Sequence, residues 1–243
     1  MIEASFAAPG IDVTFDFRDD TPPGKDPDAC SPTLRTYHRW LWTKPLPSGG
    51  VFQLRANKPG VYLHHVSELG EFFLSSDSVI PSFRKERGLS HIREQIAQHD
   101  RDTFVRLTYT IGGMMVFPAN QVARKMTING QRGCHPRIND RFDLTVECIR
   151  RHYIGSQSPL SATLGRYADF FRLFESFEGY VDFFLLNDLV TRDYSAVRFF
   201  SPFTGFDASP LPTTLQEYVE YCDCASEFVH ARNMRILDSN AAR

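Results

Sequence analysis

The residues with the clearest capacity for chemistry lie between Asn120 and Arg141, where basic side chains collect in a chain whose formal net charge is only -2. Five residues of this segment are basic and one is acidic, which gives a local balance of +4. Arginine holds phosphate oxygens through paired hydrogen bonds, and glycine lets a ligand approach the backbone closely. The segment therefore predicts an anion-binding site, formed by Arg132, Arg137, Arg141 and Gly133.

A helix is expected to start directly after this segment. Apolar residues recur at spacings of four, three and four from Phe142 to Tyr153, as on one face of a helix. A helix N-terminus offers free N–H groups and a partial positive charge, which suit a phosphate. His135 shares the basic loop and is a speculative general base. The first functional hypothesis is a protein that binds or processes a phosphate-bearing ligand, a nucleotide or RNA; whether it is an enzyme stays open.

The same arginines also have a structural interpretation. Asp143, Glu147 and Arg151 are four residues apart, so they can form ion pairs along one helix face. Arg150 also suits the C-terminal end of a helix dipole. The second hypothesis is a non-catalytic interaction module or a homodimer with its arginines in structural ion pairs. The 21 Phe and an amphipathic C-terminal helix favour it.

Two further clusters have stronger structural than functional interpretations. The acidic loop from Asp16 to Asp28 has the carboxylates that Mg²⁺ prefers, but its spacing fits no EF-hand, so a solvated loop is favoured over a metal site. The aromatic residues of YHRWLW, from Tyr37 to Trp42, can stack on bases, but at helical spacing they are more typical of a core. No cofactor fingerprint accompanies either cluster.

The elements that must position these residues indicate an α+β fold. We expect a mostly antiparallel sheet from the N-terminal half, packed by helices from the C-terminal half. Residues 1–130 read as strand-rich and residues 139–238 as helix-rich, and no linker divides the chain, so 1–243 is predicted to be one domain. Alternating apolar residues predict strands at Ile11–Arg18 and within Phe104–Phe117. The apolar run Tyr180–Val190 fits a helix or a strand equally.

Helix starts are marked more clearly than strands. Ser31 before Pro32 and Ser158 before Pro159 are typical of a capped helix with proline in its first turn. Thr214 and Glu217 have the spacing of a capping box for a last helix.

Composition restricts the setting of the chain. With 42% hydrophobic and 23% charged residues it is typical of a globular protein, and the charge balance argues against a general nucleic-acid coat. Met1–Gly10 lacks the features of a signal peptide, and no window is long and apolar enough for a membrane span. Five cysteines without a CxxC pair favour free thiols in a reducing cytoplasm.

Six stretches of the chain carry a family resemblance: DFRDDTPPGKDPD, SPTLRTYHRWLWTKPLPSG, HHVSELGEFFLSSD, TINGQRG, DRFDLTVECIRRHY and GYVDFFLLNDLV. In these stretches the sequence resembles an uncharacterised bacterial family of about this length, and the likeness spans nearly the whole chain. The resemblance implies a single bacterial domain of unknown function. It implies no activity and no site residues.

Overall fold

A computed structural model describes residues 10–83 and 85–241. A small antiparallel sheet runs through the middle of these residues in the order β1-β2-β3. Its strands are β1 (Leu63–Ser67), β2 (Gly70–Ser78) and β3 (Met114–Pro118). The first two form a hairpin in which Leu63 pairs with Leu74, and Ser78 of β2 pairs with Met114 of β3. The α+β prediction is thus confirmed, with a sheet smaller than a strand-rich 1–130 implies.

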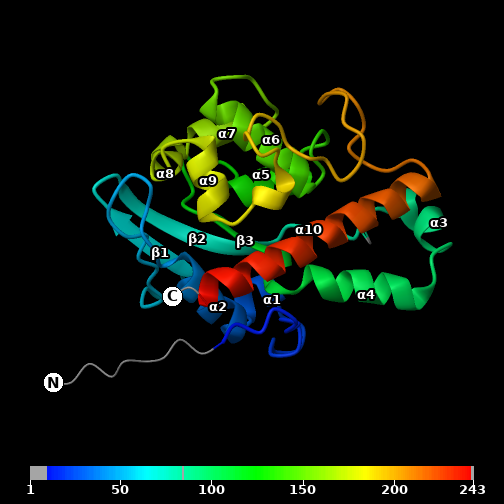
Figure 1. The fold of residues 1–243 in the computed structure, drawn as a ribbon, viewed down its shortest axis with the longest axis horizontal. Helices are drawn as coiled ribbons and strands as arrows, with labels where there is room; N and C mark the ends of the chain where they lie inside the picture. Colours follow the sequence, from blue (N-terminus) through cyan, green and yellow to red (C-terminus); the bar gives the residue numbers. More distant parts are fainter. Residues whose placement is uncertain (1–9, 84, 242–243) are drawn as a thin grey trace.

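The helices before the sheet are α1 (Pro27–Cys30) and α2 (Pro32–Trp42), and α3 (Ser90–Arg93) and α4 (Gln98–Thr108) lie between β2 and β3. After the sheet come α5 (Ile128–Cys134), α6 (Phe142–Tyr153), α7 (Ser161–Gly165), α8 (Ala168–Arg172), α9 (Phe177–Phe183) and α10 (Leu215–Ala241). In Figure 1 the group α5 to α9 lies on one side of the sheet, and α10 crosses the other side next to α4. Short 3-10 turns occur at Arg87–Leu89, Ile111–Gly113 and Asn187–Leu189.

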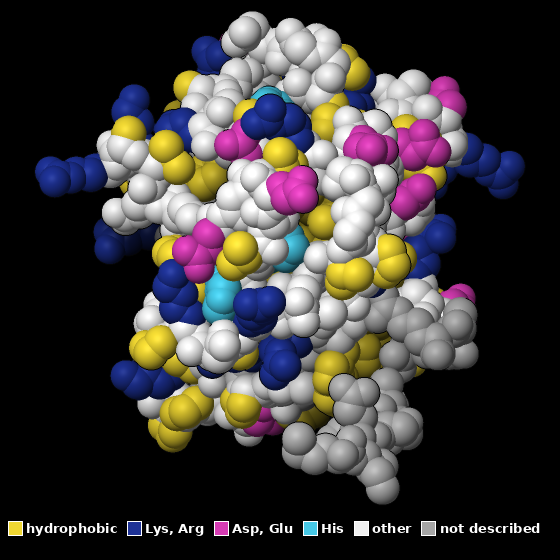
Figure 2. All heavy atoms as spheres, turned by 90° about the vertical axis from the view of Figure 1, so that its left-hand side faces the viewer, with side chains coloured by type: hydrophobic (Ala, Val, Ile, Leu, Met, Phe, Trp, Pro, Cys, Tyr) yellow, Lys and Arg dark blue, Asp and Glu magenta, His cyan; other side chains and the backbone are white. Residues whose placement is uncertain are grey.

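The core is one cluster of buried apolar side chains that joins the sheet to both helix groups. Phe52 and Phe174 are fully buried, and their rings meet at a centroid distance of 6.1 Å. Trp42, at the end of α2, packs its ring against Phe184 after α9. The aromatic residues of α2 therefore serve the core. The surface over the hairpin end, in contrast, mixes Lys and Arg with acidic and hydrophobic side chains (Figure 2).

Several helix starts agree with the sequence analysis. The Ser31 side chain accepts a hydrogen bond from the Leu34 N–H, and α2 begins at Pro32. Thr214 Oγ1 accepts from the Glu217 N–H, and the Glu217 carboxylate caps Thr213 in return. The second serine–proline pair is different, because α7 starts at Ser161 and Leu160 is its N-cap.

Two predicted strands are wrong. Residues 11–18 form turns. The Asp12 carboxylate accepts the N–H of Thr14 at 2.8 Å, and the Asp16 carboxylate accepts the N–H of Arg18 at 3.0 Å. The first part of Phe104–Phe117 belongs to α4, and only its last residues enter β3. Phe104 and Thr108 are buried one helical turn apart, so apolar spacing there fits a helix as well as a strand. The undecided run Tyr180–Val190 continues α9 and then becomes a 3-10 turn.

Candidate functional site: a carboxylate pocket beside Arg132

Arg132, near the end of α5, is completely buried against strands β2 and β3. Its Nη1 forms ion pairs with Asp77 on β2 and with Asp140, the latter at 2.7 Å. Nη2 donates to the Asp140 carbonyl at 2.5 Å, and the Asp140 N–H donates back to the Arg132 carbonyl at 3.0 Å. All of these contacts are internal, so this guanidinium connects three segments of the fold.

Arg141 is also buried and faces a different part of the molecule. Its guanidinium pairs with Asp143, in the first turn of α6, and its Nη1 donates to the Pro210 carbonyl at 2.9 Å. Asp143 in turn accepts the Phe200 N–H at 2.9 Å. This pair fixes the long segment between α9 and α10 to the start of α6.

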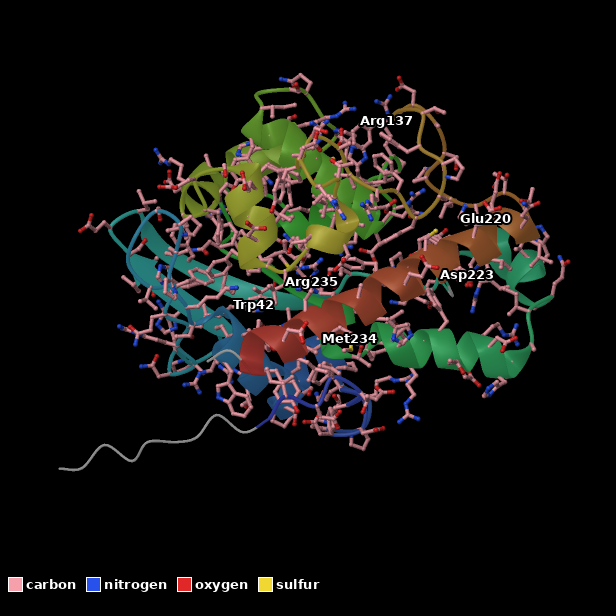
Figure 3. All side chains as sticks on the ribbon, in the orientation of Figure 1. Trp42, Arg137, Glu220, Asp223, Met234 and Arg235 are labelled. Atoms are coloured by element: carbon pink, nitrogen blue, oxygen red, sulfur yellow. The ribbon has the colours of Figure 1, made fainter. Side chains whose placement is uncertain are left out.

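The other predicted site residues lie closer to the surface. Arg137 is exposed and pairs at 3.1 Å with Asp207, which is itself exposed; Figure 3 shows it at the periphery, away from α10. His135 ends α5, and its Nδ1 accepts the Arg137 N–H at 3.2 Å. Burial, and then the charge of Arg137, lower the pKa of His135, which favours its neutral form. Gly133 lines a pocket described below.

The three arginines thus contact three separate groups of residues, each with a carboxylate partner. The ion-pair part of the structural interpretation is present, including Glu147 with Arg151 at 2.7 Å. Anion binding by Arg132, Arg137, Arg141 and Gly133, with His135 as base, stays a prediction. A phosphate at Arg132 or Arg141 would have to displace a carboxylate that is already paired with the guanidinium.

The acidic loop likewise does not gather its carboxylates around a metal. Asp16 pairs with Arg18, and Asp20 accepts hydrogen bonds from Ser31 Oγ at 2.6 Å and from the Thr33 N–H at 2.9 Å. Within the described part of the chain, no group of three or more histidine, cysteine or acidic residues has a metal-binding arrangement. Asp16 is buried and Asp20 is half-buried, so the solvated-loop interpretation does not describe these two residues, which hold local structure instead.

The sequence does not predict the polar cavity that Gly133 helps to line. It has a volume of about 400 Å³ and lies between α1, the end of β2, the end of α4 and the loop after α5. Asp28 reaches it from α1, Asp77 from β2 and Asp140 from the loop. Asn139 and Asp140 adopt left-handed backbone conformations, with φ of 46° and 67°, which asparagine and aspartate tolerate best among non-glycine residues. That turn places the Asp140 carboxylate at Arg132.

The three carboxylates are held differently. Asp77 and Asp140 share one nitrogen of Arg132, so their contacting oxygens lie within about 5 Å of one another. Asp28 Oδ2 accepts the Ser78 N–H at 2.9 Å. Its Oδ1 is buried and has no hydrogen-bond partner among the described residues. Buried carboxylate oxygens are nearly always paired, so this atom needs a physical explanation.

The local environment shifts both carboxyl groups toward their protonated forms. Burial raises the pKa of Asp77 to about 7, although the charge of Arg132 opposes the shift. Burial likewise raises the pKa of Asp28 to about 6, and the nearby Asp26 and Asp140 add to it. Several carboxylates share one buried arginine, so holding a proton near neutral pH relieves their mutual repulsion.

These shifts predict how stability depends on pH. The folded chain binds protons on Asp28 and Asp77 more tightly than the unfolded chain, so their contribution to the free energy of unfolding is lost as pH rises from about 4 to about 7. The pKa of His38 is lowered by burial to about 3 and acts in the opposite direction. We therefore compare melting temperatures of wild type and Asp28→Asn/Asp77→Asn across this range. The wild type should gain stability relative to the variant as the pH falls, and a constant difference would contradict the shifts.

Comparison with other proteins defines a family without adding a fold or a function. No curated protein and no solved structure matches the chain significantly. Among the described residues, none of the helices has both the length and the apolar character that crossing a membrane requires. Residues 11–236 match a family of unknown function, DUF6994, and the chain belongs to that family.

Proposed function

We propose that this protein binds a cationic small molecule, an amine with a short apolar chain, in the carboxylate pocket. Among the described residues of the lining, five are acidic and one, Lys85, is basic; the acids are Asp26, Asp28, Asp77, Glu86 and Asp140. Ile80, Phe83 and Val105 supply apolar wall for the alkyl part of such a ligand. The volume suits a small molecule.

The unpartnered oxygen of Asp28 carries this proposal. An ammonium group donates up to three hydrogen bonds, and a charge-assisted bond to a carboxylate is roughly twice as strong as a neutral one. An ammonium at Asp28 Oδ1 would supply the missing partner of that atom and offset the excess negative charge. The other oxygen of this carboxyl, Oδ2, is anchored by the Ser78 N–H at 2.9 Å, and Oδ1 itself is buried.

The pocket geometry gives less support to the two functions that the sequence suggested. A nucleotide or RNA at the arginines would meet the acidic residues of the neighbouring pocket, and Arg132 has its donors occupied by internal acceptors. An interaction module with structural ion pairs is compatible with the pairing of Arg141 and Asp143, but that pairing specifies no partner. We therefore place ligand binding at the carboxylates and keep phosphate as the competing ligand in the test.

Isothermal titration calorimetry of the full chain tests the proposal, with 1,4-diaminobutane and butylamine in one arm and inorganic phosphate and a nucleoside monophosphate in the other. Amines should bind, and more tightly as pH rises from about 5.5 to 7.5, because the pKa values of Asp28 and Asp77 lie in that range. Asp28→Asn should weaken amine binding about tenfold, the value of one charge-assisted hydrogen bond.

The matched control is Asp19→Asn, an exposed aspartate that does not line the pocket. It should bind amines like the wild type. Equal affinity of wild type and Asp28→Asn would refute the proposal. Binding of phosphate without binding of amines would return the function to the arginine loop.

The setting that we propose for this function is the bacterial cytoplasm. All five cysteines are unpaired, and burial raises the pKa of Cys148 and of Cys222 to about 12, so these two thiols stay protonated and unreactive. Free thiols suit a reducing compartment.

A further inference from the structure

One exposed face of α10 carries large apolar side chains that do not contribute to the core. Val219, Asp223, Ser226, His230 and Met234 follow each other at spacings of four, three, four and four residues, so they lie along one helix face. We call these five residues the α10 ridge. It extends over roughly 22 Å at the helical rise per residue. Its two large apolar side chains are exposed, Val219 by 39% and Met234 by 57%.

A groove runs along this ridge, between α10 and α4. Its volume is about 380 Å³, and its apolar lining includes Phe104 and Leu107 from α4 and Tyr218 from α10. Figure 1 shows the two helices next to each other for much of the length of α4. A cavity of this size holds the bulky apolar side chain of a docked segment.

The charge that the first part of α10 brings to the groove has one sign. From Leu215 to Ala231, α10 contains four acidic residues and no lysine or arginine; the acids are Glu217, Glu220, Asp223 and Glu227. Within the described residues none of these four forms an ion pair. Figure 3 shows Glu220 and Asp223 along the first half of α10, over α4. Asp100 adds a further acid from the opposite wall.

Arg101, the arginine among the described residues of the groove lining, does not neutralise these acids. Arg101 donates through Nη1 to the Arg93 carbonyl at 3.0 Å and through Nη2 to Gln98, so its guanidinium is directed toward the end of α3 and the start of α4. A surface with exposed apolar side chains between acids that form no ion pair matches a partner with apolar side chains between basic residues. The N-terminal nine residues of the chain contain no lysine or arginine, so they lack the complementary charge.

We propose that the α10 ridge and its groove dock a basic amphipathic helix of another protein. Apolar side chains of that helix would cover Val219 and Met234 and enter the groove, while its lysines or arginines would face Asp223, Glu227 and Asp100. This is the helix-in-groove mode of recognition, with anchors at helical spacing. The surface is separate from the carboxylate pocket, and its occupation does not depend on the amine ligand.

The probe is a fluorescent synthetic helix of leucine and lysine, with leucine at every third or fourth position. Its binding to the full chain is followed by fluorescence anisotropy. The comparison peptides are a scrambled helix of the same composition and a leucine–glutamate helix of the same pattern. The leucine–lysine helix should bind tightest, and less tightly at high salt, because exposed charges are screened.

Two variants locate the binding. Asp223→Lys/Glu227→Lys and Met234→Asp should each weaken binding roughly tenfold or more. Glu68→Lys and Val66→Asp change exposed residues of the hairpin in the same way and should leave binding unchanged.

Three results would overturn the proposal. The scrambled peptide could bind as tightly as the patterned one, which would reduce the interaction to charge alone. The hairpin variants could weaken binding as much as the ridge variants. Sedimentation could show a dimer that Asp223→Lys/Glu227→Lys dissociates, which would assign the ridge to a second copy of this chain.

Discussion

Replacement of Arg132 by methionine should lower the free energy of unfolding by about 3–5 kcal/mol, because it leaves Asp77 and Asp140 crowded beside each other without their cation. The Asp140 carbonyl would also lose its donor. For a chain of this size the corresponding fall in melting temperature is roughly 10 °C or more. Chemical denaturation followed by circular dichroism measures the change.

Two further variants test whether the loss comes from the ion pair. Arg132→Met/Asp77→Asn should recover part of it, because removing both charges is less costly than removing one. Arg137→Ala should unfold like the wild type, because its pair with Asp207 is exposed on both sides. If Arg132→Met were as stable as Arg137→Ala, the buried pair would have no structural role and a ligand role for Arg132 would regain its basis.

The second large effect is expected at Arg232, in the last part of α10. This buried guanidinium donates to backbone carbonyls of Gly112, Met114 and Phe184 at 2.8–3.2 Å, and burial lowers its pKa to about 10, so it stays charged at neutral pH. Arg232→Met would orphan all three carbonyls at once, and we expect a loss of about 3–5 kcal/mol.

The shape of the guanidinium is as important here as its charge. Arg232→Lys should recover little of the loss, because one ammonium cannot reproduce the planar fork that reaches these carbonyls. The matched control is Arg235→Ala, one helical turn away in the same helix, whose pair with Asp188 is partly exposed. We expect near wild-type urea denaturation for this control. A fully stable Arg232→Lys would show that charge alone suffices at this position.

The sequence predicted local features of the fold best where one residue determines one feature. Ser31 and Thr214 were identified as caps because capping depends on a side chain and the next three residues. The helix from Phe142 to Tyr153 was predicted with its observed bounds, since its periodicity is long and regular. The strand expected at 11–18 failed because Asp12 and Asp16 close local turns that alternation does not reveal.

The candidate pocket could not be predicted from the sequence, because its residues come together only in the folded chain. Asp28, Asp77 and Asp140 lie on α1, on β2 and in a loop, and only the packing of the fold brings them to one pocket, where Asp77 and Asp140 pair with Arg132. The arginine segment is distinguished by its charge, but Asp77 and Asp207, which pair with Arg132 and Arg137, are distant in sequence.

The contacts of α10 with β3 also have a consequence for synthesis on the ribosome. The Gly112 N–H is satisfied by Asn233 Oδ1 at 2.7 Å, and the Gly112 and Met114 carbonyls by Arg232. A Cβ at Gly112 would lie 2.5 Å from the Val229 carbonyl, so the two backbones are in direct contact. The backbone groups of Gly112 and Met114 therefore depend on partners that lie more than a hundred residues later in the chain. The nascent sheet therefore emerges with an open end, and the chain closes it only after α10 has been synthesised.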